Sequence, residues 1–525
     1  MSLNPKFSIP IPNQHLISAI KQTDSNSKIS KHTEVLKKLL NQFKPIDFSS
    51  RSFEEYDKLM KKYEDEKTLD KDKVLEKLSK FKLQDRHYYI CCIDEVQNVA
   101  KENNWDIVRY NDEIYLYNGE YWQKVESDVF QIFLADVARV LGVPSMIEKH
   151  YGFREQLKKQ FDVTQILAIK QTDSKSSEVY INLLDCTIKV SNGEVKNIPF
   201  NKEHFLNYQL PYKYDSAAKC PLFMAFLSEV LPDESAQQVL SEYLGYLFIR
   251  NGNKSIKAEK MLVLYGSGAN GKSVVFEVIL ALLGRENVSN YSLTSLTDTN
   301  GYYRAQISNK LVNYGSEIGG KLEADMLKKM ASGEPIEARQ PYGRPLLLHE
   351  YAKLIFNCNQ LPKDVEQTDA YFRRFLILPF NVTIEEEKQD KHLANKIVES
   401  ELPGILNWVL EGLKRLLSQG RFSKCKISDD MLIRYKIESD SVQIYLEEYS
   451  IQKTSDTKEF VTLKTVYDAY RKFCLESGYK PISKLNFSKR LQSLKFLIEK
   501  RNIGKVVLLS TPLENVFSEG HFCHS

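Results

Sequence analysis

The chain has 525 residues, of which 42% are hydrophobic and 27% are charged, as in ordinary soluble globular proteins. This length exceeds what one hydrophobic core usually supports, so we expect roughly two to four domains. The net charge of +4 is small for a chain of this size. It excludes binding of nucleic acid through overall charge alone, so any basic surface has to be local.

Signals for export or membrane insertion are not found in the sequence. The first residues, MSLNPKFSIPIPNQ, lack the basic start and the apolar stretch of a signal peptide, and no apolar run approaches the roughly 18 residues that cross a membrane. The eight cysteines form no C-x-x-C pair, which argues against a zinc finger or a disulfide framework. We therefore expect a cytoplasmic protein without a membrane partner.

Composition and periodicity predict five regions in chain order. Residues 1–90 form a polar arm with a lysine- and glutamate-rich helical stretch near 53–82, and residues 91–250 form an α+β accessory domain. Residues 251–385 form a nucleotide-binding module. A helical segment over 386–432 and a separate C-terminal unit over 433–525 complete the chain.

Local patterns predict elements on both sides of the nucleotide-binding module. Residues 115–122 alternate and turn at Asn118-Gly119 as a β-hairpin would, and 178–182 with 187–190 form a second strand pair. Helical spacing predicts helices over 221–230 and 234–248. A further helical pattern over 385–419 is expected to break near Pro403-Gly404.

The most informative stretch is GSGANGKS, which matches G-x-x-x-x-G-K-[ST], the loop that cradles nucleotide phosphates. An apolar run at 261–265 predicts the strand before it, and helical spacing up to Gly284 predicts the helix after it. We expect Lys272 to contact the β- and γ-phosphates of ATP and the Ser273 hydroxyl to contact Mg²⁺. The predicted nucleotide-binding residues are Gly266, Ser267, Gly268, Ala269, Asn270, Gly271, Lys272 and Ser273.

Hydrolysis also needs a carboxylate and a sensor for the γ-phosphate. Residues 310–316 predict a short strand that ends at Glu317, our candidate for water activation and metal contact, and Asp325 or Glu323 could share the metal role. A second apolar strand ends at Asn359, which would lie beside the phosphate loop at the edge of a parallel sheet. Asn357 is the neighbouring alternative for this sensor.

Two arginine-containing stretches are further candidates for contacts with phosphate groups. Arg373 and Arg374 precede an apolar run and could stabilise transition-state charge on a neighbouring subunit's ATP, or could form surface ion pairs. Residues 333–348 predict a hairpin with Arg339, Tyr342 and Arg344 around its corner. Such a hairpin would suit single-stranded nucleic acid through phosphate contacts and stacking, although a plain hairpin has the same pattern.

The C-terminal unit reads as two helices, over 462–477 and 484–496, followed by a strand pair over 496–500 and 505–509. This is the order of a winged helix-turn-helix. Its basic residues suggest binding to duplex or forked DNA, and a packing domain with a solvated basic face is the alternative. The predicted DNA contacts here are Lys484, Lys489, Arg490, Lys500 and Arg501.

In order and spacing, these stretches resemble a superfamily 3 helicase of the AAA+ class. They are most similar to the C-terminal helicase of phage, plasmid and poxvirus primase-helicases. The resemblance rests on GSGANGKS, the strand ending in Ser316-Glu317, GEPIEARQPYG, NCNQLP and DAYFRRFLILPF, and it covers about residues 95–510. It implies an α/β fold with a P-loop AAA+ parallel-sheet ATPase core, an N-terminal α+β accessory domain and a C-terminal winged-helix domain.

By this resemblance Glu317 is the Walker B acid, Asn359 the sensor and Arg374 the arginine finger, with the hairpin from Arg339 to Arg344 gripping DNA. It also implies a homo-hexamer that translocates 3′ to 5′ on single-stranded DNA and unwinds duplexes during replication of a phage, plasmid or other mobile element in a bacterial cell. A separate primase or polymerase would be a partner.

Two departures from the family pattern stand out: the acidic pair before Glu317 is reduced to Ser-Glu, and residues 1–90 contain no recognisable primase domain. An origin-binding initiator or helicase loader that uses ATP as an assembly switch is the alternative function. A nucleic-acid-binding protein with a degenerate NTPase is a third interpretation.

Overall fold

The computed structural model describes residues 30–65, 70–164, 178–251, 256, 258–316, 318, 323–341, 343, 345–362 and 365–511. The chain divides into two compact units. The first comprises Met1–Asp173, Tyr180–Ile188 and Asn197–Gln209, and the second comprises Ser174–Val179, Lys189–Lys196 and Leu210–Ser525. No helix in the described part of the chain is long and apolar enough to cross a membrane.

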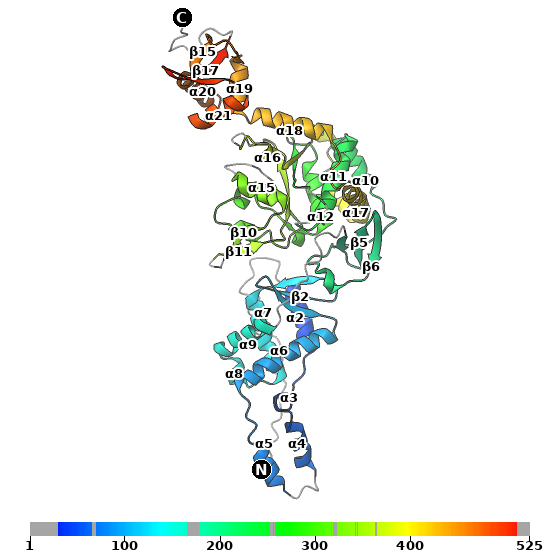
Figure 1. The fold of residues 1–525 in the computed structure, drawn as a ribbon. Helices are drawn as coiled ribbons and strands as arrows, with labels where there is room; N and C mark the ends of the chain where they lie inside the picture. The colour runs from blue at the N-terminus through cyan, green and yellow to red at the C-terminus, as the bar shows by residue number, and fades with distance from the viewer. Residues whose placement is uncertain are drawn as a thin grey trace. The chain divides into compact units, whose positions relative to one another are not determined.

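The first unit combines helices with an antiparallel three-stranded sheet (Figure 1). Its core lies among the long helices α6, α7 and α9, and apolar residues of the sheet also belong to it. The helices are α2 (Ser30–Leu40), α3 (Phe48–Ser52), α4 (Tyr56–Glu64), α5 (Lys71–Leu78), α6 (Asp85–Glu102), α7 (Ser127–Leu141), α8 (Ser145–Glu148) and α9 (Tyr151–Thr164). The strands are β1 (Asp106–Tyr110), β2 (Glu113–Tyr117) and β3 (Trp122–Val125).

The hairpin predicted over 115–122 is confirmed as β2 and β3, which pair with Tyr117 opposite Trp122. The Asn118 side chain accepts hydrogen bonds from the backbone N–H groups of Glu120 and Tyr121, and Gly119 takes a left-handed φ of +97°. The predicted boundary after residue 90 instead falls inside α6. The charged stretch 53–82 contains two helices, α4 and α5, neither of which has a buried residue in its described part.

A second three-stranded sheet follows, made of β4 (Val179–Asn182), β5 (Thr187–Ser191) and β6 (Glu194–Ile198), and the short helix η1 (Lys202–His204) comes after it. Helices α10 (Pro221–Val230) and α11 (Glu234–Tyr246) match the two predicted helices closely. Both belong to the second unit, so the region expected to be one accessory domain over 91–250 is divided between the two units.

The second unit is organised around a five-stranded parallel sheet with strand order β13-β7-β12-β9-β8. The strands are β7 (Met261–Tyr265), β8 (Val288–Ser289), β9 (Val312–Gly315), β12 (Lys353–Cys358) and β13 (Phe375–Pro379). The central strands are apolar along most of their length because helices cover both faces of the sheet. The fold of this unit is therefore mixed α/β with a parallel sheet.

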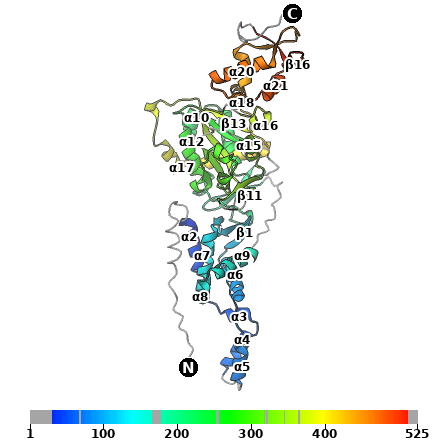
Figure 2. The same cartoon turned by 90° about the vertical axis from the view of Figure 1, so that its left-hand side faces the viewer.

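Side chains of β7 alternate between the two faces of this sheet. Met261 and Val263 belong to one hydrophobic cluster together with Leu327 of α15 (Ala324–Ser332) and Tyr435 of α18 (Lys426–Glu438). On the other face lie α12 (Lys272–Leu283), α11 and α17 (Leu393–Gln419), as Figures 1 and 2 show. Shorter elements complete the unit: η2 (Arg285–Asn287), α13 (Leu293–Leu296), α14 (Tyr302–Ala305), β10 (Ile336–Arg339), β11 (Pro345–Leu348), α16 (Asp369–Phe372) and η3 (Glu386–Lys388).

The break predicted near Pro403 is wrong, because α17 continues through Pro403 as one helix of 27 residues. Long-range packing holds it together. The Glu401 carboxylate accepts the backbone N–H groups of Leu222 and Phe223 at the start of α10, at 2.9 and 2.8 Å. A Cβ on Gly404 would lie 2.3 Å from the carbonyl of Lys219, so this glycine permits a close approach of two chain segments rather than ending the helix.

The C-terminal part contains α19 (Ser441–Glu448), β14 (Gln452–Lys453), β15 (Phe460–Thr462), α20 (Leu463–Glu476), α21 (Lys484–Ser493), β16 (Ile498–Arg501) and β17 (Gly504–Ser510). The two predicted helices and the strand pair are confirmed as α20, α21 and the antiparallel pair β16–β17. They enclose a core of their own around Tyr470, Phe487 and Val507. The predicted boundary at 432/433 falls inside α18.

Candidate functional site

The GSGANGKS loop joins the end of β7 to the start of α12, as its flanking patterns predict. Gly271 has a φ of +80°, and a Cβ there would lie 2.7 Å from Val230 Cγ1. A Cβ on Gly266 would lie 2.3 Å from the carbonyl oxygen of Phe380. Both glycines are therefore required by close packing as well as by the backbone path of the loop.

Lys272 is 7% exposed, and loop acceptors surround its ammonium group. Its Nζ donates to the carbonyl oxygens of Gly266 at 2.8 Å and Ser267 at 2.9 Å, and to Oδ1 of Asn270 at 2.9 Å. These three acceptors match the three N–H bonds of a lysine ammonium. Burial lowers the pKa of Lys272 from its ordinary value. All three acceptors are neutral, so a bound phosphate would supply a negative counter-charge beside this desolvated cation.

The rest of the loop is open to solvent. Ser267, Gly268 and Ala269 are exposed, and so is Ser273 in the first turn of α12. The first N–H groups of a helix have no intrahelical partner, and together with the helix dipole they favour an anion. The residues present therefore fit the phosphates of a nucleotide.

Asn359 directly follows β12, the strand that pairs with β7. The register sets Cys358 opposite Tyr265, and the backbone N–H of Gly266 donates to the carbonyl oxygen of Cys358 at 3.0 Å. The exposed Asn359 therefore emerges beside the first residue of the phosphate loop. Asn357, the alternative sensor, accepts a hydrogen bond from the buried Tyr314 hydroxyl at 3.0 Å, a core contact.

Glu317 is not among the residues that the structure describes. The strand before it is described. Strand β9 ends at Gly315, where a Cβ would lie 2.6 Å from the ring of Phe356. Asn313 within it is fully buried and bonds the backbone N–H and carbonyl of Tyr291. These two unusual strand residues thus have packing roles.

The alternative acids lie close to the start of α15. Glu323 immediately precedes that helix, and Asp325 is exposed and pairs with Lys328 at 2.8 Å. The hydrogen bond from Lys328 lowers the pKa of Asp325. Within the described ranges, no group of three or more His, Cys, Asp or Glu could hold a metal ion. The predicted metal ligand that can be seen is Ser273.

The two predicted finger arginines differ in exposure. Arg374 is 6% exposed; its Nη2 donates to Ser332 Oγ at 2.7 Å and its Nη1 lies 3.2 Å from Glu259 Oε2. Arg373 has a side chain that is 63% exposed. In this conformation Arg373, not Arg374, is accessible to a second molecule. Glu259 was not predicted as a partner of these arginines. Its position just before the strand that leads into the phosphate loop was the signal that the sequence offered.

The predicted hairpin is confirmed: β10 and β11 pair antiparallel, with Arg339 opposite Pro345. Arg339 is exposed and its Nε donates to the carbonyl oxygen of Gly343 at 3.3 Å. Tyr342 and Arg344 lie outside the described residues. The buried Arg304, which sequence reasoning missed, ties the hairpin to its support by donating to the carbonyl oxygens of Glu337 at 2.8 Å and Leu296 at 3.0 Å.

The basic residues of the C-terminal part fall into two groups. Lys484, Lys489 and Lys500 are exposed. Arg490 instead donates to the buried Asp440 carboxylate through Nε at 2.8 Å and Nη2 at 2.5 Å.

Arg501, like Arg490, has partners within the C-terminal part. It donates to the carbonyl oxygen of Thr457 at 2.8 Å and lies over the Phe460 ring at 4.2 Å. The structure therefore gives Arg490 and Arg501 structural roles where DNA contacts were expected.

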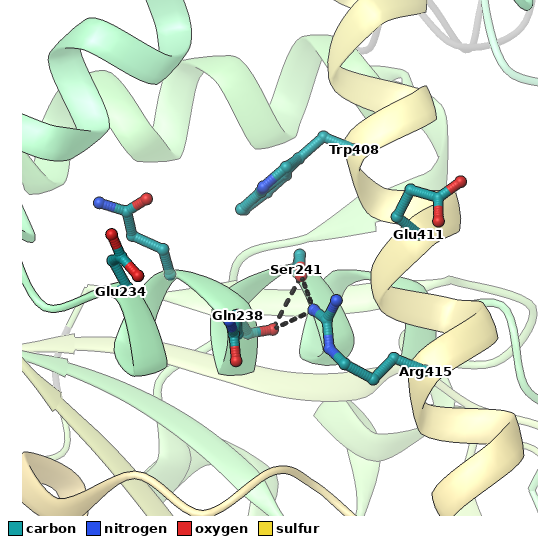
Figure 3. Close-up of a pocket in the computed structure, with 7 residues that line it drawn as sticks. Glu234, Gln238, Ser241, Trp408, Glu411 and Arg415 are labelled. Atoms are coloured by element: carbon teal, nitrogen blue, oxygen red, sulfur yellow. Dashed lines mark hydrogen bonds between the residues drawn. The ribbon is translucent and has the colours of Figure 1, made fainter.

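A shallow hollow of about 250 Å³ lies between α11 and α17 (Figure 3). None of the residues that line it is a predicted site residue. The Arg415 guanidinium in its lining is already paired: it donates to Ser241 Oγ at 2.9 Å and to the buried Glu242 carboxylate at 2.6 Å. The Trp408 ring projects over the hollow. The cation of this hollow is therefore already neutralised within the chain.

Three family models match the chain, and together they follow its order. The model described as "D5 N terminal like" matches residues 87–232, a family of unknown function (DUF5906) matches residues 264–374, and "Poxvirus D5 protein-like" matches residues 437–506. By its first and third matches the chain resembles the phage- and poxvirus-type primase-helicase family. The match to the family of unknown function begins within β7 and ends at Arg374, so it contains the GSGANGKS loop and the arginine pair.

Two curated proteins with similar sequences are viral. "Putative helicase L207/L206" of Acanthamoeba polyphaga mimivirus is 22% identical over 277 residues, which is 47% of this chain and 28% of the relative. "Putative helicase 121R" of Invertebrate iridescent virus 3 is 22% identical over 286 residues, 48% of this chain and 30% of the relative. The chain thus spans less than a third of the length of these curated relatives.

Among solved structures, the apo A form of the NrS-1 C-terminal region is similar, with a TM-score of 0.41 and 13% identity. That match covers 79% of this chain and 98% of the other. A second apo structure of the same region has a TM-score of 0.35 and 14% identity, and covers 63% of this chain and 95% of the other.

Proposed function

We propose that the protein is an ATP-dependent DNA helicase of superfamily 3, with an AAA+ ATPase core, that acts in replication of a virus, plasmid or other mobile element. One observation carries this proposal: the phosphate loop and Asn359 share one edge of a parallel sheet, while Arg373 and Arg374 stand at the opposite edge. The resemblance to the primase-helicase family and the names of the viral relatives support the same activity.

In this proposal ATP and Mg²⁺ bind at the GSGANGKS loop. Lys272 contacts the β- and γ-phosphates and Ser273 contacts the metal ion. Glu317 supplies the carboxylate for metal and water, and Asn359 hydrogen-bonds the γ-phosphate or the water. Bound nucleotide supplies the phosphoryl group, and these side chains position and stabilise it.

The distance between the two sheet edges supports action in trans. Strand β13 starts at Phe375, opposite the first residue of β7, and five strand residues span about 16 Å. The phosphate loop follows the last residue of β7. Arg373 therefore projects from the edge away from its own loop, and it would serve the ATP of a neighbouring subunit. We propose a homo-hexameric ring on this basis.

DNA would be bound at two places. The β10–β11 hairpin presents the exposed Arg339, and we propose Tyr342 and Arg344 as further contacts with single-stranded DNA. The C-terminal part would act as a winged helix on forked or duplex DNA through the exposed Lys484, Lys489 and Lys500. Translocation 3′ to 5′, and a separate primase or polymerase as partner, follow as expectations from the family resemblance.

The direct test is unwinding of a forked DNA with ATP and Mg²⁺, comparing the wild-type chain with Lys272→Ala. We expect strand separation by the wild type and loss of both unwinding and ATP hydrolysis in the variant, since Lys272 provides the buried charge of the loop. Asn395→Ala serves as a folding control because this exposed residue of α17 belongs to neither the proposed ATP site nor the proposed DNA contacts. Equal unwinding by the wild type and Lys272→Ala would refute the proposal.

The alternative is an initiator or helicase loader that uses ATP as an assembly switch. The separate core of the C-terminal part and its exposed lysines favour some role at duplex DNA in either case. The two functions differ in steady-state behaviour. A helicase shows ATP hydrolysis that single-stranded DNA stimulates and separates the fork, whereas a loader binds ATP and DNA but leaves the fork intact.

A further inference from the structure

Asn270 lies at the junction between the phosphate loop and the strand that follows the arginine pair. Its Oδ1 accepts a hydrogen bond from Lys272 Nζ at 2.9 Å, and its Nδ2 donates to the carbonyl oxygen of Phe380 at 2.9 Å. The residue is 3% exposed, so water cannot readily replace either bond. One amide thus joins the loop lysine to the carboxyl end of β13.

Neighbouring residues are arranged around this amide bridge. A Cβ on Gly266 would lie 2.4 Å from Asn270 Nδ2 and 2.3 Å from the carbonyl oxygen of Phe380, so the first glycine of the motif leaves room for the bridge. A second bond runs in parallel, from the backbone N–H of Ile384 to the carbonyl oxygen of Ala269 at 2.8 Å. The loop is therefore tied twice to the segment after β13.

Strand β13 connects this segment to Arg373 and Arg374. It lies at the edge of the parallel sheet, and its strand partner among the described residues is β7, paired from Phe375 to Pro379. The carbonyl oxygen of Arg374 accepts from the N–H of Met261 at 2.7 Å at one end, and the N–H of Phe380 donates to Tyr265 at 2.7 Å at the other. The strand thus forms a continuous hydrogen-bonded connection between the end of the phosphate loop and the arginine pair.

We propose that Asn270 is a positioning residue that passes the nucleotide occupancy of the phosphate loop through β13 to Arg373 and Arg374. The inference rests on the proposed function, since it requires a nucleotide at the loop. It assigns to one amide the coupling between the ATP bound by a subunit and the exposed Arg373 that this subunit offers to its neighbour, with Arg374 beside it.

The physical reason is a change of partner at Lys272. A phosphate is charged and forms stronger hydrogen bonds with an ammonium group than neutral carbonyl oxygens do. When Lys272 turns to the phosphate, Asn270 Oδ1 becomes a buried acceptor without a donor, which is unfavourable. The amide then reorients, and its bond to Phe380 changes with it. The nucleotide therefore has a different free energy of interaction with each of the two orientations of the Asn270 amide. Coupling between two sites requires such a difference.

Hydrogen exchange measured by mass spectrometry tests this on the full-length chain, with and without saturating Mg²⁺ and a non-hydrolysable ATP analogue. In the wild type we expect altered exchange both in the loop, residues 266–273, and in a peptide spanning residues 371–378. In Asn270→Ala the loop still responds at saturating nucleotide, while the response of residues 371–378 is lost. Asn270→Asp keeps an oxygen for Lys272 but removes the donor to Phe380, and should lose the same response.

Gln389→Ala is the matched control. Gln389 Nε2 donates to the carbonyl oxygen of Ile384 at 2.8 Å, so its removal deletes an amide contact on the same segment without touching Lys272. This variant should respond like the wild type. A wild-type loop that does not respond to nucleotide would refute the proposed function. A wild-type loop that responds while residues 371–378 do not, or an undiminished response of those residues in Asn270→Ala, would refute the role of Asn270 alone.

Discussion

At the scale of single residues, charge alone does not reveal what a basic side chain does. Arg490 and Lys489 are neighbours on α21, yet Lys489 is exposed while Arg490 donates to Asp440, which is 2% exposed. The other oxygen of Asp440 accepts the backbone N–H groups of Val442 and Gln443 and so begins α19. Arg490 thus anchors α21 to the start of α19.

This difference predicts opposite effects for two adjacent substitutions. Arg490→Ala leaves a buried carboxylate without its cation, so we expect a loss of about 2–3 kcal/mol in the stability of the C-terminal part. Lys489→Ala should leave stability unchanged and weaken binding to forked DNA, more so at low salt. Chemical denaturation and DNA titration measure the two effects. Equal stability of both variants would contradict the anchoring role.

At the scale of elements, α17 shows how packing overrides local sequence preference. Its glycines lie where other backbones approach: a Cβ on Gly412 would lie 2.4 Å from the carbonyl carbon of Ser241 in α11. The reciprocal contact is at Gly245 of α11, where a Cβ would lie 2.7 Å from Leu413 Cβ. The two helices are therefore packed as closely as their backbones allow, on the same face of the sheet as α12.

We expect Gly412→Ala to destabilise the second unit although alanine favours helices. The gain in helix propensity is at most about 1 kcal/mol, and overpacking against a backbone costs more, which leaves a net loss of about 2 kcal/mol. Asn395→Ala is a control at an exposed position of the same helix. Thermal denaturation of the two variants decides the matter, and an unchanged midpoint for Gly412→Ala would argue against the close contact.

At the scale of the whole molecule, the two ends of the parallel sheet carry different sets of polar and charged residues. Its carboxyl edge carries the phosphate loop and Asn359, while its amino edge carries Arg373, Arg374 and Lys260. Burial lowers the pKa of Lys260, and the nearby arginines lower it further against the opposing effect of Asp429. Arg374 is held by Glu259 and Ser332 within its own chain.

Such an arrangement predicts that ATP hydrolysis is shared between chains. Arg373→Ala and Lys272→Ala should each abolish hydrolysis, because the first lacks the donated cation and the second lacks a working loop. Mixing the two should restore part of the activity, since one intact loop can meet one intact Arg373. Steady-state ATPase assays of the mixture measure this, with each variant alone as control. Absence of any rescue would count against action in trans.

The sequence alone was sufficient wherever neighbouring residues set the structure. The strand before GSGANGKS, the helix after it, the β10–β11 hairpin and the C-terminal helices were all predicted from periodicity, glycine positions and turns. Asn359 was placed beside the loop because carboxyl ends of adjacent parallel strands share an edge. These features depend on local backbone preferences and on a rule that holds for every parallel sheet.

Only the tertiary structure decided which side chains are free and where elements end. Helix α17 passes through Pro403 because α10 and α11 pack against it, and α6 and α18 cross the expected boundaries at 90 and 432. Arg374, Arg490 and Arg501 are held by Glu259, Asp440 and Thr457. Such partners are distant in sequence or come from different elements, so the burial and pairing of a charge depend on the folded chain.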